Sequence, residues 1–476
     1  MMRGGKAESI ARPRHAVDEI FILFLSHPQA PPLVSAAPMK SPAFLFPSRC
    51  AALALACLAL GACVSYHPAP LTVERGAADL QGRALGGGAW DGERFRAAAL
   101  NFHPDMEVAR AKLATAQAAV LTAGARPNPT VGFSATNISR LLGGASPWSN
   151  GFTLDVPIET AGKRGQRIAQ AQALVNAAAL NLATAERTVA ARVRTSFLTL
   201  YAAQQREGLL GLQQTDQAEA VKLFDARIAA GEVSRVESLQ ARLQFNQSRL
   251  LTRDAQKLRG EAQTTLAAAT GVSVHALEKV RLSFAELESL PSPPAERALR
   301  RAALLQRSDV LSTLAEYAAA EAAVRLEIAK QWPDLHLGPG YAYDQGQNKW
   351  TIGFTLAIPL LDQNRGPISE ALAKRREAAA AFSAQQARAL GEIELALASY
   401  RGAVTKLDTA NHLLAAQERQ QRSSEALFKA GETDRLTLVS AQVELQAARL
   451  SRLDALIGAQ QARGALEDAS GVRCRR

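Results

Sequence analysis

The chain has 476 residues, a formal net charge of +11 and only 5% aromatic residues. Long stretches consist mainly of Ala, Leu, Gln, Arg and Glu, a composition typical of long helices and coiled coils rather than of ordinary globular domains. Basic residues alternate with acidic ones at helical spacing instead of clustering, which indicates solvated helix faces and argues against a nucleic-acid partner.

The first segment, residues 1–62, is typical of an export leader. Its apolar run, 51–60, follows basic residues and is too short to span a membrane as a helix. The run ends in LGAC, which resembles a bacterial lipobox and predicts a lipid on Cys63, with a plain secretory signal as the alternative. We expect translation to start at Met39, because a signal beginning earlier would include a long charged prelude. By resemblance to such lipoproteins, Val64 directs the product to the outer membrane.

The remaining composition argues against catalysis and against bound cofactors. Of the four cysteines, Cys50 and Cys57 leave with the leader, Cys63 takes the lipid and Cys474 is left alone, so the mature chain has no disulfide framework. No metal-ligand spacing, phosphate-binding loop, dinucleotide fingerprint or nucleophile motif occurs. We therefore expect no enzyme activity, no cofactor and no resident metal.

The elements of the first half follow a linker. Residues 63–94 are rich in Pro and Gly over 64–92 and predict an extended, lipidated linker. The first half, 95–271, is expected to contain a helix to about residue 125, strands over 130–138 and 150–158, and a helix over about 165–229.

The second half, 295–471, is expected to repeat this order. Its predicted elements are a helix over about 295–331, strands over 335–343 and 352–358, and a helix over about 366–429. Residues 272–294 join the halves as a side structure, and 472–476 form a tail.

Two motifs occur once in each half. The peptide GFTL begins at Gly151 and again at Gly353, and each copy runs into a proline, Pro157 or Pro359. Ala-Gly-Glu recurs likewise, at 230–232 and 430–432. This offset is far longer than the roughly 20–50-residue period of a solenoid. The chain therefore contains two copies of one structural unit.

The strands alternate apolar residues with small or polar ones, and their length is near the ~9–11 residues of a tilted transmembrane strand. This pattern predicts a lipid-facing set, Phe152, Leu154, Phe354 and Leu356, and a pore-facing set, Thr153, Thr355 and His336. Pro157 and Pro359 would mark the junction of barrel and tunnel. A half-buried soluble sheet is the alternative. Four strands cannot close a transmembrane barrel, so the barrel requires several chains.

The predicted long helices are expected to form coiled-coil hairpins. At ~1.5 Å per residue each would span roughly 95 Å. Apolar residues keep coiled-coil spacing on the last helices, at Ile393, Leu397, Tyr400, Val404, Leu407 and Leu414 and at Leu436, Val439, Val443, Leu450, Leu453 and Ile457. Gly231 and Gly431 lie where each helix must turn back.

These features together resemble the TolC family of outer-membrane factors over roughly residues 95–471. The resemblance implies a mainly α homotrimer with one 12-stranded membrane β-barrel, to which each chain gives four strands, continuous with a coiled-coil periplasmic tunnel. It implies contact with outer-membrane lipid and two protein partners, a periplasmic adaptor (membrane fusion protein) and an inner-membrane RND pump. The tips at Gly231, Glu232, Gly431 and Glu432 would form the entrance and dock the adaptor, although Ala-Gly-Glu is also ordinary turn chemistry.

The segment PIETAGKRG, residues 157–165, and the first tip, 230–237, resemble the heavy-metal, CzcC-like branch of that family. Many family members narrow the entrance with a ring of Asp on the second hairpin, but the matching positions here are Thr437 and Ser440. Glu237 holds the equivalent place in the first half. It would form a ring of three carboxylates in a trimer, or else lie on a solvated helix face.

The sequence thus predicts a passive outer-membrane efflux duct of a tripartite RND-type system, for heavy-metal cations. A drug-efflux or type I secretion channel has the same architecture and remains open. A periplasmic coiled coil without a pore is disfavoured by the alternating strands at equivalent positions in both halves.

Overall fold

The computed structural model describes residues 66–137, 147–290 and 295–472. The predicted leader, its start at Met39 and the lipidation residue Cys63 lie outside the described residues. The chain divides into two units, Met1–Pro70 and Leu71–Arg476. In the first, the described residues 66–70 have no regular secondary structure. All elements below belong to the second unit.

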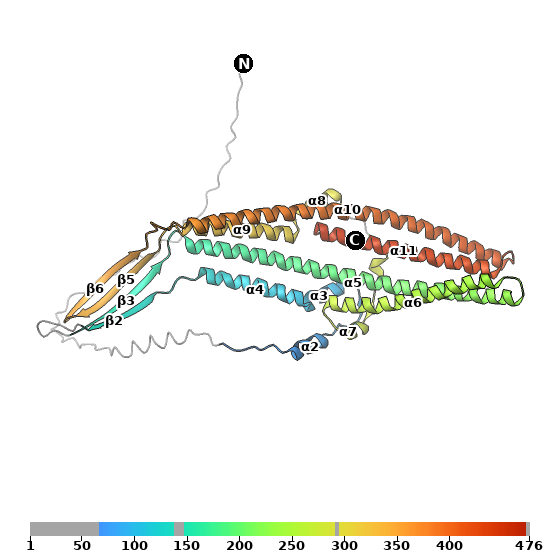
Figure 1. Ribbon diagram of the computed structural model, residues 1–476, viewed down its shortest axis with the longest axis horizontal. Coiled ribbons are helices and arrows are strands. Elements are labelled where there is room, and N and C mark those ends of the chain that lie inside the picture. Colours follow the sequence, from blue (N-terminus) through green and yellow to red (C-terminus); the bar gives the residue numbers. More distant parts are fainter. Residues whose placement is uncertain (1–65, 138–146, 291–294, 473–476) are drawn as a thin grey trace, which may run out of the picture. The chain divides into compact units, whose positions relative to one another are not determined.

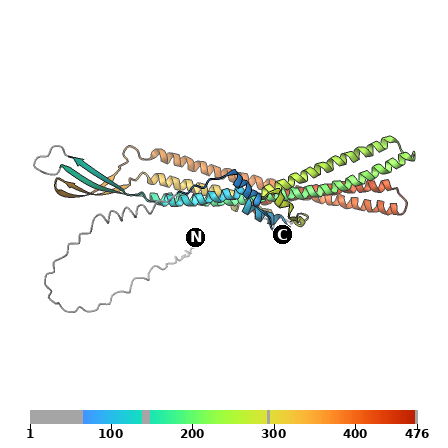
Figure 2. The same cartoon turned by 90° about the horizontal axis from the view of Figure 1, so that it is seen from below.

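Two helical hairpins dominate this unit. Helices α5 (Lys163–Ala229, 67 residues) and α6 (Arg235–Thr270, 36 residues) form the first, and α10 (Arg365–Lys429, 65 residues) and α11 (Arg435–Ser470, 36 residues) form the second. The long helices begin within two residues of the predicted positions. Within this unit the hairpin tips lie at one end and a four-stranded sheet at the other (Figures 1 and 2).

The predicted coiled-coil seam is only partly correct. Ile393, Leu397 and Tyr400 are buried in α10. Val404 is 36% exposed, and the next buried residue of this helix is Ala410, which is not a predicted seam position. An α-helix has 3.6 residues per turn, so a strict seven-residue repeat drifts by about 20° per heptad. On α10 the first three seam positions are therefore fully buried, whereas Leu407 and Leu414 further along are only partly buried.

The first predicted helix, over about 95–125, is two helices, α3 (Gly92–Phe102) and α4 (Pro104–Gly124). They separate at His103, whose ψ of 128° is extended. Pro104 causes the break, because its ring disfavours the helical conformation of the residue before it. His103 then caps α4, with Nδ1 accepting from Asp105 N at 3.2 Å.

The predicted helix over about 295–331 is also two, α8 (Glu296–Leu305) and α9 (Ser308–Ala329), and no proline marks this break. Arg307 is extended and buried between them. Its guanidinium binds Asp309 and Glu392, each at 2.6 Å. These tertiary bonds, with one to Ala469 O at 3.2 Å, hold a conformation that local sequence does not specify.

The two segments predicted to connect domains have structure of their own. The linker contains α2 (Val73–Gly82), which has no buried residue, and β1 (Ala89–Trp90). The side structure contains α7 (Val274–Glu278), β4 (Arg281–Leu282) and a 3₁₀ turn, η1 (Ala285–Leu287). Strands β1 and β4 pair in parallel.

An aromatic cluster explains why these segments are ordered. Trp90, Phe95, Phe197 and Phe284 stack in succession with ring centroids 5.0, 5.6 and 4.9 Å apart. Phe95 and Phe197 are almost fully buried. The linker and the side structure therefore close the largest hydrophobic core, around the middle of α5.

The four-stranded sheet takes two strands from each half. Its order is β2 (Thr130–Asn137), β3 (Trp148–Ile158), β5 (Leu335–Asp344) and β6 (Gln347–Leu356), and all neighbours are antiparallel. Strand β6 begins earlier than the predicted 352–358. Gln345 and Gly346 both have positive φ (51° and 89°), so a two-residue hairpin turn starts the strand directly after it.

Among the described residues, none of the helices combines the length and the apolar character that crossing a membrane requires.

Candidate channel wall, helical tips and central cavity

The sheet has one apolar face that nothing else in the described chain covers. Residues directly opposite one another share a face, and the register places Phe133 opposite Phe152 and Tyr341 opposite Trp350. The first pair has ring centroids 4.9 Å apart and the second 4.8 Å. Four of the exposed side chains on this face are Trp350 (80%), Ile352 (84%), Phe354 (77%) and Val131 (75%). The predicted lipid-facing residues Phe152, Leu154, Phe354 and Leu356 all lie on this apolar face.

The opposite face is small and polar. It carries Thr, Ser, Gly and Ala from all four strands, including Thr153 and Thr355. Its charged residues form two pairs. His336 Nδ1 lies 3.0 Å from Asp155, and Lys349 Nζ lies 2.7 Å from Asp344. The sheet thus combines a predominantly apolar face, which carries Asn137, Asn150 and Asn348 at the end away from the helices, with a wettable one.

The two prolines that follow the GFTL peptides do not occupy equivalent places in the structure. Pro359 follows the end of β6, as a junction residue would, whereas Pro157 lies inside β3, opposite His336. The predicted strand over 150–158 already included Pro157, so its place inside β3 agrees with that prediction. The role of both prolines at a junction of barrel and tunnel stays a prediction. The ladder between β2 and β3 ends at Asp155, so Pro157 occupies an edge position where its missing N–H breaks no bond to β2.

The turn after β3 fastens the first half to the second. Lys163, whose side chain is 9% exposed, donates to Trp332 O at 2.7 Å and to Asp334 at 2.8 Å. Thr160 N also donates to Asp334, at 2.9 Å. Burial would raise the pKa of Asp334, but these bonds outweigh it and lower the pKa. Lys163, the first of the two basic residues in the PIETAGKRG segment, therefore has a structural partner in the second half.

A second pair closes the same turn. Arg167 forms a bidentate ion pair with Glu159, with one N–O distance of 3.0 Å, and also donates to the carbonyls that end α4, Ala123 and Ala125. The hydrogen bond from Arg167 lowers the pKa of Glu159. Sequence reasoning gave neither pair a role. The spacing of Glu159 and Arg167 within one short turn could have indicated their pair, whereas Asp334 is too distant in sequence to be recognised as the partner of Lys163.

Gly231 and Gly431 end α5 and α10 with left-handed backbone, at φ of 76° and 75°. In each tip the residue after the glycine returns a hydrogen bond to the helix. Glu232 N donates to Arg227 O at 2.9 Å, and Glu432 N to Leu427 O at 3.0 Å. This is the Schellman arrangement, which favours glycine because the left-handed region has a low cost without a Cβ. All four predicted tip residues are exposed.

Charged side chains join the two tips. Arg227 of the first hairpin pairs with Asp434 of the second, and Arg435 of the second binds Glu219 of the first at 2.7 Å. Asp434 also caps α11, and its pKa falls to about 2, mainly through the hydrogen bonds from Thr437 and then through Arg227. The sequence does not predict these pairs, because they depend on how the two hairpins align.

Glu237, the predicted entrance acid, is exposed in the first turn of α6. Its carboxylate lies 3.5 Å from Ser234 Oγ, and its N–H donates to Ser234 O at 3.2 Å. The Ser-x-x-Glu spacing is that of a capping box, but the Ser234 side chain does not cap α6. The hydroxyl of Ser234 contacts the Glu237 carboxylate instead, so the position of this carboxylate does not depend on a capping box.

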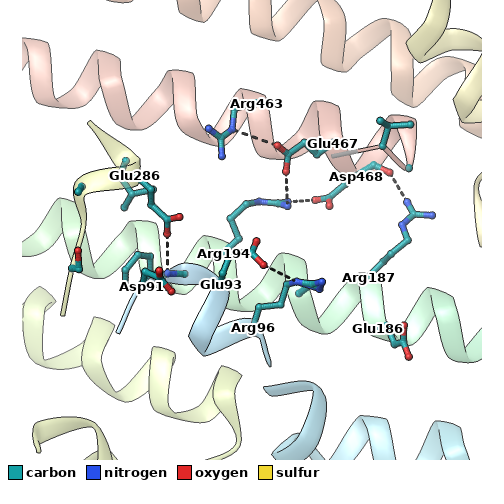
Figure 3. A pocket seen from close by; sticks show the side chains of 18 residues that line it. Asp91, Glu93, Arg96, Glu186, Arg187, Arg194, Glu286, Arg463, Glu467 and Asp468 are labelled. Carbon is teal, nitrogen blue, oxygen red and sulfur yellow. Dashed lines mark hydrogen bonds and ion pairs between the residues drawn. The ribbon is translucent and has the colours of Figure 1, made fainter. Parts of the chain in front are cut away.

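A cavity of about 890 Å³ lies between α3, α5, the segment around η1 and the end of α11. Figure 3 shows that Arg194 points toward Glu467 and Asp468, whereas Glu186 points away from them. Arg194 lies 2.5 Å from Asp468 and 3.4 Å from Glu467, and Arg187 donates to Asp468 O at 2.5 Å. Burial lowers the pKa of Arg187, although Asp309 opposes this effect. The cavity's charges therefore connect α5 of the first half to α11 of the second.

Nothing in the described part of the chain gathers three or more His, Cys, Asp or Glu side chains as a metal cage. Comparison with known proteins gives the family. The sequence profile described as Outer membrane efflux protein matches residues 96–272 and 299–472.

The chain belongs to the outer membrane efflux protein family. Its members are passive outer-membrane channels and not enzymes, so the chain is a channel protein of the outer membrane and the prediction of no enzyme activity is confirmed. The twin matches, one in each half, agree with the predicted internal repeat.

Relatives of this outer membrane efflux protein differ in their named cargo. It is 27% identical over 456 residues to the pyoverdine export outer membrane protein OpmQ of Pseudomonas aeruginosa, covering 86% of this chain and 95% of OpmQ. It is 26% identical over 366 residues to the cobalt-zinc-cadmium resistance protein CzcC of Cupriavidus metallidurans, covering 76% of this chain and 84% of CzcC. The crystal structure of the outer membrane protein VceC of Vibrio cholerae has the same fold, with a TM-score of 0.66 and 18% identity over 81% of this chain and 97% of VceC.

Proposed function

We propose that the protein forms, as a homotrimer, a passive exit duct across the outer membrane and periplasm within a tripartite export system. The sheet carries this proposal. One face is apolar and exposed, the other is small and polar, and the edge strands β2 and β6 have no further partner among the described residues. Backbone groups at a sheet edge cannot stay unpaired in lipid. Copies of the same chain at both edges, with lipid on the apolar face, would satisfy them.

The length of the hairpins supports a proposal for the other parts of the system. At ~1.5 Å per residue the 67-residue α5 extends about 100 Å away from the sheet. The exposed tips at Gly231, Glu232, Gly431 and Glu432 would then meet a periplasmic adaptor, and an RND-type pump in the inner membrane would supply the energy. A lipid on Cys63 would anchor the chain, which mass spectrometry of the mature N-terminus would test. An unmodified cysteine would contradict the anchor.

We propose heavy-metal cations as the cargo. The similarity to CzcC supports this, as does the resemblance of residues 157–165 to the metal branch. A carboxylate and an imidazole on the polar face of the sheet suit a cation better than a bulky organic molecule. Export of a small organic compound is the second candidate, because the similarity to OpmQ is equally high and covers more of the chain.

A deletion strain decides between these cargoes. We expect lower tolerance of cobalt, zinc or cadmium, restored by the plasmid-borne gene, and unchanged tolerance of a drug panel. Drug sensitivity or loss of siderophore export with unchanged metal tolerance would contradict the proposed cargo.

We also propose that Glu237 forms a ring of carboxylates at the entrance of the trimer. Glu237→Gln should then alter single-channel conductance or cation preference in a planar bilayer. Glu232→Gln, a charge change at the tip outside the proposed ring, is the matched control. Identical currents through the Glu237→Gln and wild-type channels would contradict the ring.

A further inference from the structure

We propose that His336 and Asp155 form a binding site for a divalent transition-metal cation on the polar face of the sheet. The two residues lie on neighbouring strands, β5 and β3, at the end of the sheet that joins the helices. His336 Nδ1 lies 3.0 and 3.2 Å from the two carboxylate oxygens of Asp155. Both side chains are a little under half exposed, at 43% and 45%, so an ion in the lumen could reach them.

The carboxylate decides which imidazole nitrogen is available to an ion. An ionised carboxylate only accepts hydrogen bonds, so this contact requires a proton on Nδ1 of His336, and the tautomer that carries its single proton there has its lone pair on Nε2. Within the described ranges, the hydrogen bonds of this imidazole all involve Nδ1. Histidines that bind metals in proteins typically donate one ring N–H to a carboxylate and bind through the other nitrogen. Asp155 is therefore a positioning residue for a His336 ligand.

The charges around the pair favour a cation. The junction carries three carboxylates (Asp155, Glu159 and Asp334) and three permanent cations (Lys163, Arg164 and Arg167). Lys163 pairs with Asp334 and Arg167 with Glu159, whereas Arg164 donates to Gly124 O at 2.6 Å, at the end of α4. Within the described ranges, the hydrogen bonds of the Asp155 carboxylate go to the imidazole of His336. A carboxylate behind an imidazole makes the free ring nitrogen a better ligand for a cation.

The ligand set also indicates the class of ion and the strength of binding. Imidazole suits borderline cations such as Zn²⁺ and Co²⁺, with water completing the shell. A single protein nitrogen binds such an ion weakly. A conduction pathway needs contacts that are favourable enough to enter and weak enough to leave. The site therefore suits a passing cargo, a role that depends on the proposed function, whereas the binding itself does not.

Equilibrium dialysis of the purified full-length protein against ZnCl₂ tests the site. We expect the wild type to bind one more Zn²⁺ per chain than His336→Gln. Asp155→Asn should weaken the affinity of that ion about 10- to 100-fold, the usual effect of removing a residue that positions a ligand. Asp344→Asn, which removes a carboxylate from the same face but away from His336, is the control and should bind as the wild type does.

Two results would overturn the site: equal Zn²⁺ binding by His336→Gln and wild type, or an equal loss in Asp344→Asn and Asp155→Asn. Circular dichroism of each variant excludes misfolding as the cause. Metal tolerance of the deletion strain separates this inference from the proposed function. Unchanged tolerance with His336-dependent binding refutes the cargo and supports the site, whereas reduced tolerance with His336-independent binding refutes the site and supports the cargo.

Discussion

Asp434 holds the tip of the second hairpin in two ways that substitutions can separate. Its Oδ1 accepts from Thr437 N at 2.8 Å and from Thr437 Oγ1 at 2.6 Å, which caps α11. Its Oδ2 pairs with Arg227 across the two tips. Asp434→Asn keeps an oxygen for the cap and loses the charge, whereas Asp434→Ala loses both.

The expected magnitudes follow from exposure. The side chains of Arg227 and Asp434 are 32% and 43% exposed, so solvent screens the pair and its loss should cost about 0.5 kcal/mol. Removal of an N-cap costs about 1 kcal/mol more. Since 1.4 kcal/mol is a factor of ten, local opening of the tip should rise about 2-fold in Asp434→Asn and roughly 10-fold in Asp434→Ala.

Hydrogen exchange measured by mass spectrometry on peptides covering 427–437 reads this opening directly. The pKa of Asp434 is lowered from 3.8 to about 2. A carboxyl whose folded pKa is depressed stabilises the fold above its unfolded pKa and loses that effect as the pH falls through the folded value. Wild-type protection should therefore fall between about pH 4 and pH 2, while Asp434→Ala shows no such step. Equal exchange in the two variants, or pH-independent wild-type protection, would refute the reasoning.

Three further substitutions test the junction, the turn and the apolar face. Lys163→Met should destabilise the fold by about 2–3 kcal/mol, since it removes charged hydrogen bonds to Trp332 O and Asp334; urea denaturation followed by circular dichroism measures this, and an unchanged midpoint would contradict it. Gly431→Ala should lower the free energy of unfolding by about 1 kcal/mol, because a Cβ there has space but the left-handed φ is unfavourable for alanine. Gly458→Ala, at a helical position that also has space for a Cβ, is the control and should not destabilise the protein. Phe354→Arg should lower folding into lipid vesicles by about 2–4 kcal/mol if its face contacts lipid, and Thr355→Arg on the other face should be tolerated; equal effects would contradict the assignment of faces.

Local signals were sufficient for much of the fold. Gly231 and Gly431 marked the ends of both long helices, because a left-handed residue is what the turn requires. Alternation placed Phe152 and Phe354 on one face of one sheet. These features depend on residues close together in sequence, which is why a single sequence could predict them.

Two of the errors, the break before Pro104 and the start of β6 after Gly346, lie at local signals that the sequence prediction did not use. The others arise where distant residues decide the local conformation. Arg307 breaks a helix through Glu392 and Ala469 O, neither of which is near it in sequence. Trp90 orders a Gly-rich linker through a core that it shares with Phe197. The pairing of Arg227 with Asp434 likewise depends on the alignment of two hairpins. No periodicity or turn signal encodes such contacts.

The two ends of the hairpins are held with different strength, which predicts where the protein opens first. At the sheet end, Lys163 binds Trp332 O from a buried position, and Asn364 donates to Glu327 O at 2.7 Å, so both strand-to-helix junctions are tied to the end of α9. At the tips, partly exposed ion pairs connect the two hairpins. Such pairs contribute little to stability, because water screens them.

Regions held by few buried contacts open at low free-energy cost. Peptides covering 427–437 should therefore exchange faster than peptides covering 163–170, and added salt should widen the difference by screening only the exposed pairs. Faster exchange at the junction than at the tips would show that the buried lysine is not the stronger tie. The two halves are thus joined by buried hydrogen bonds beside the sheet and by weaker, exposed ion pairs at the tips of the hairpins.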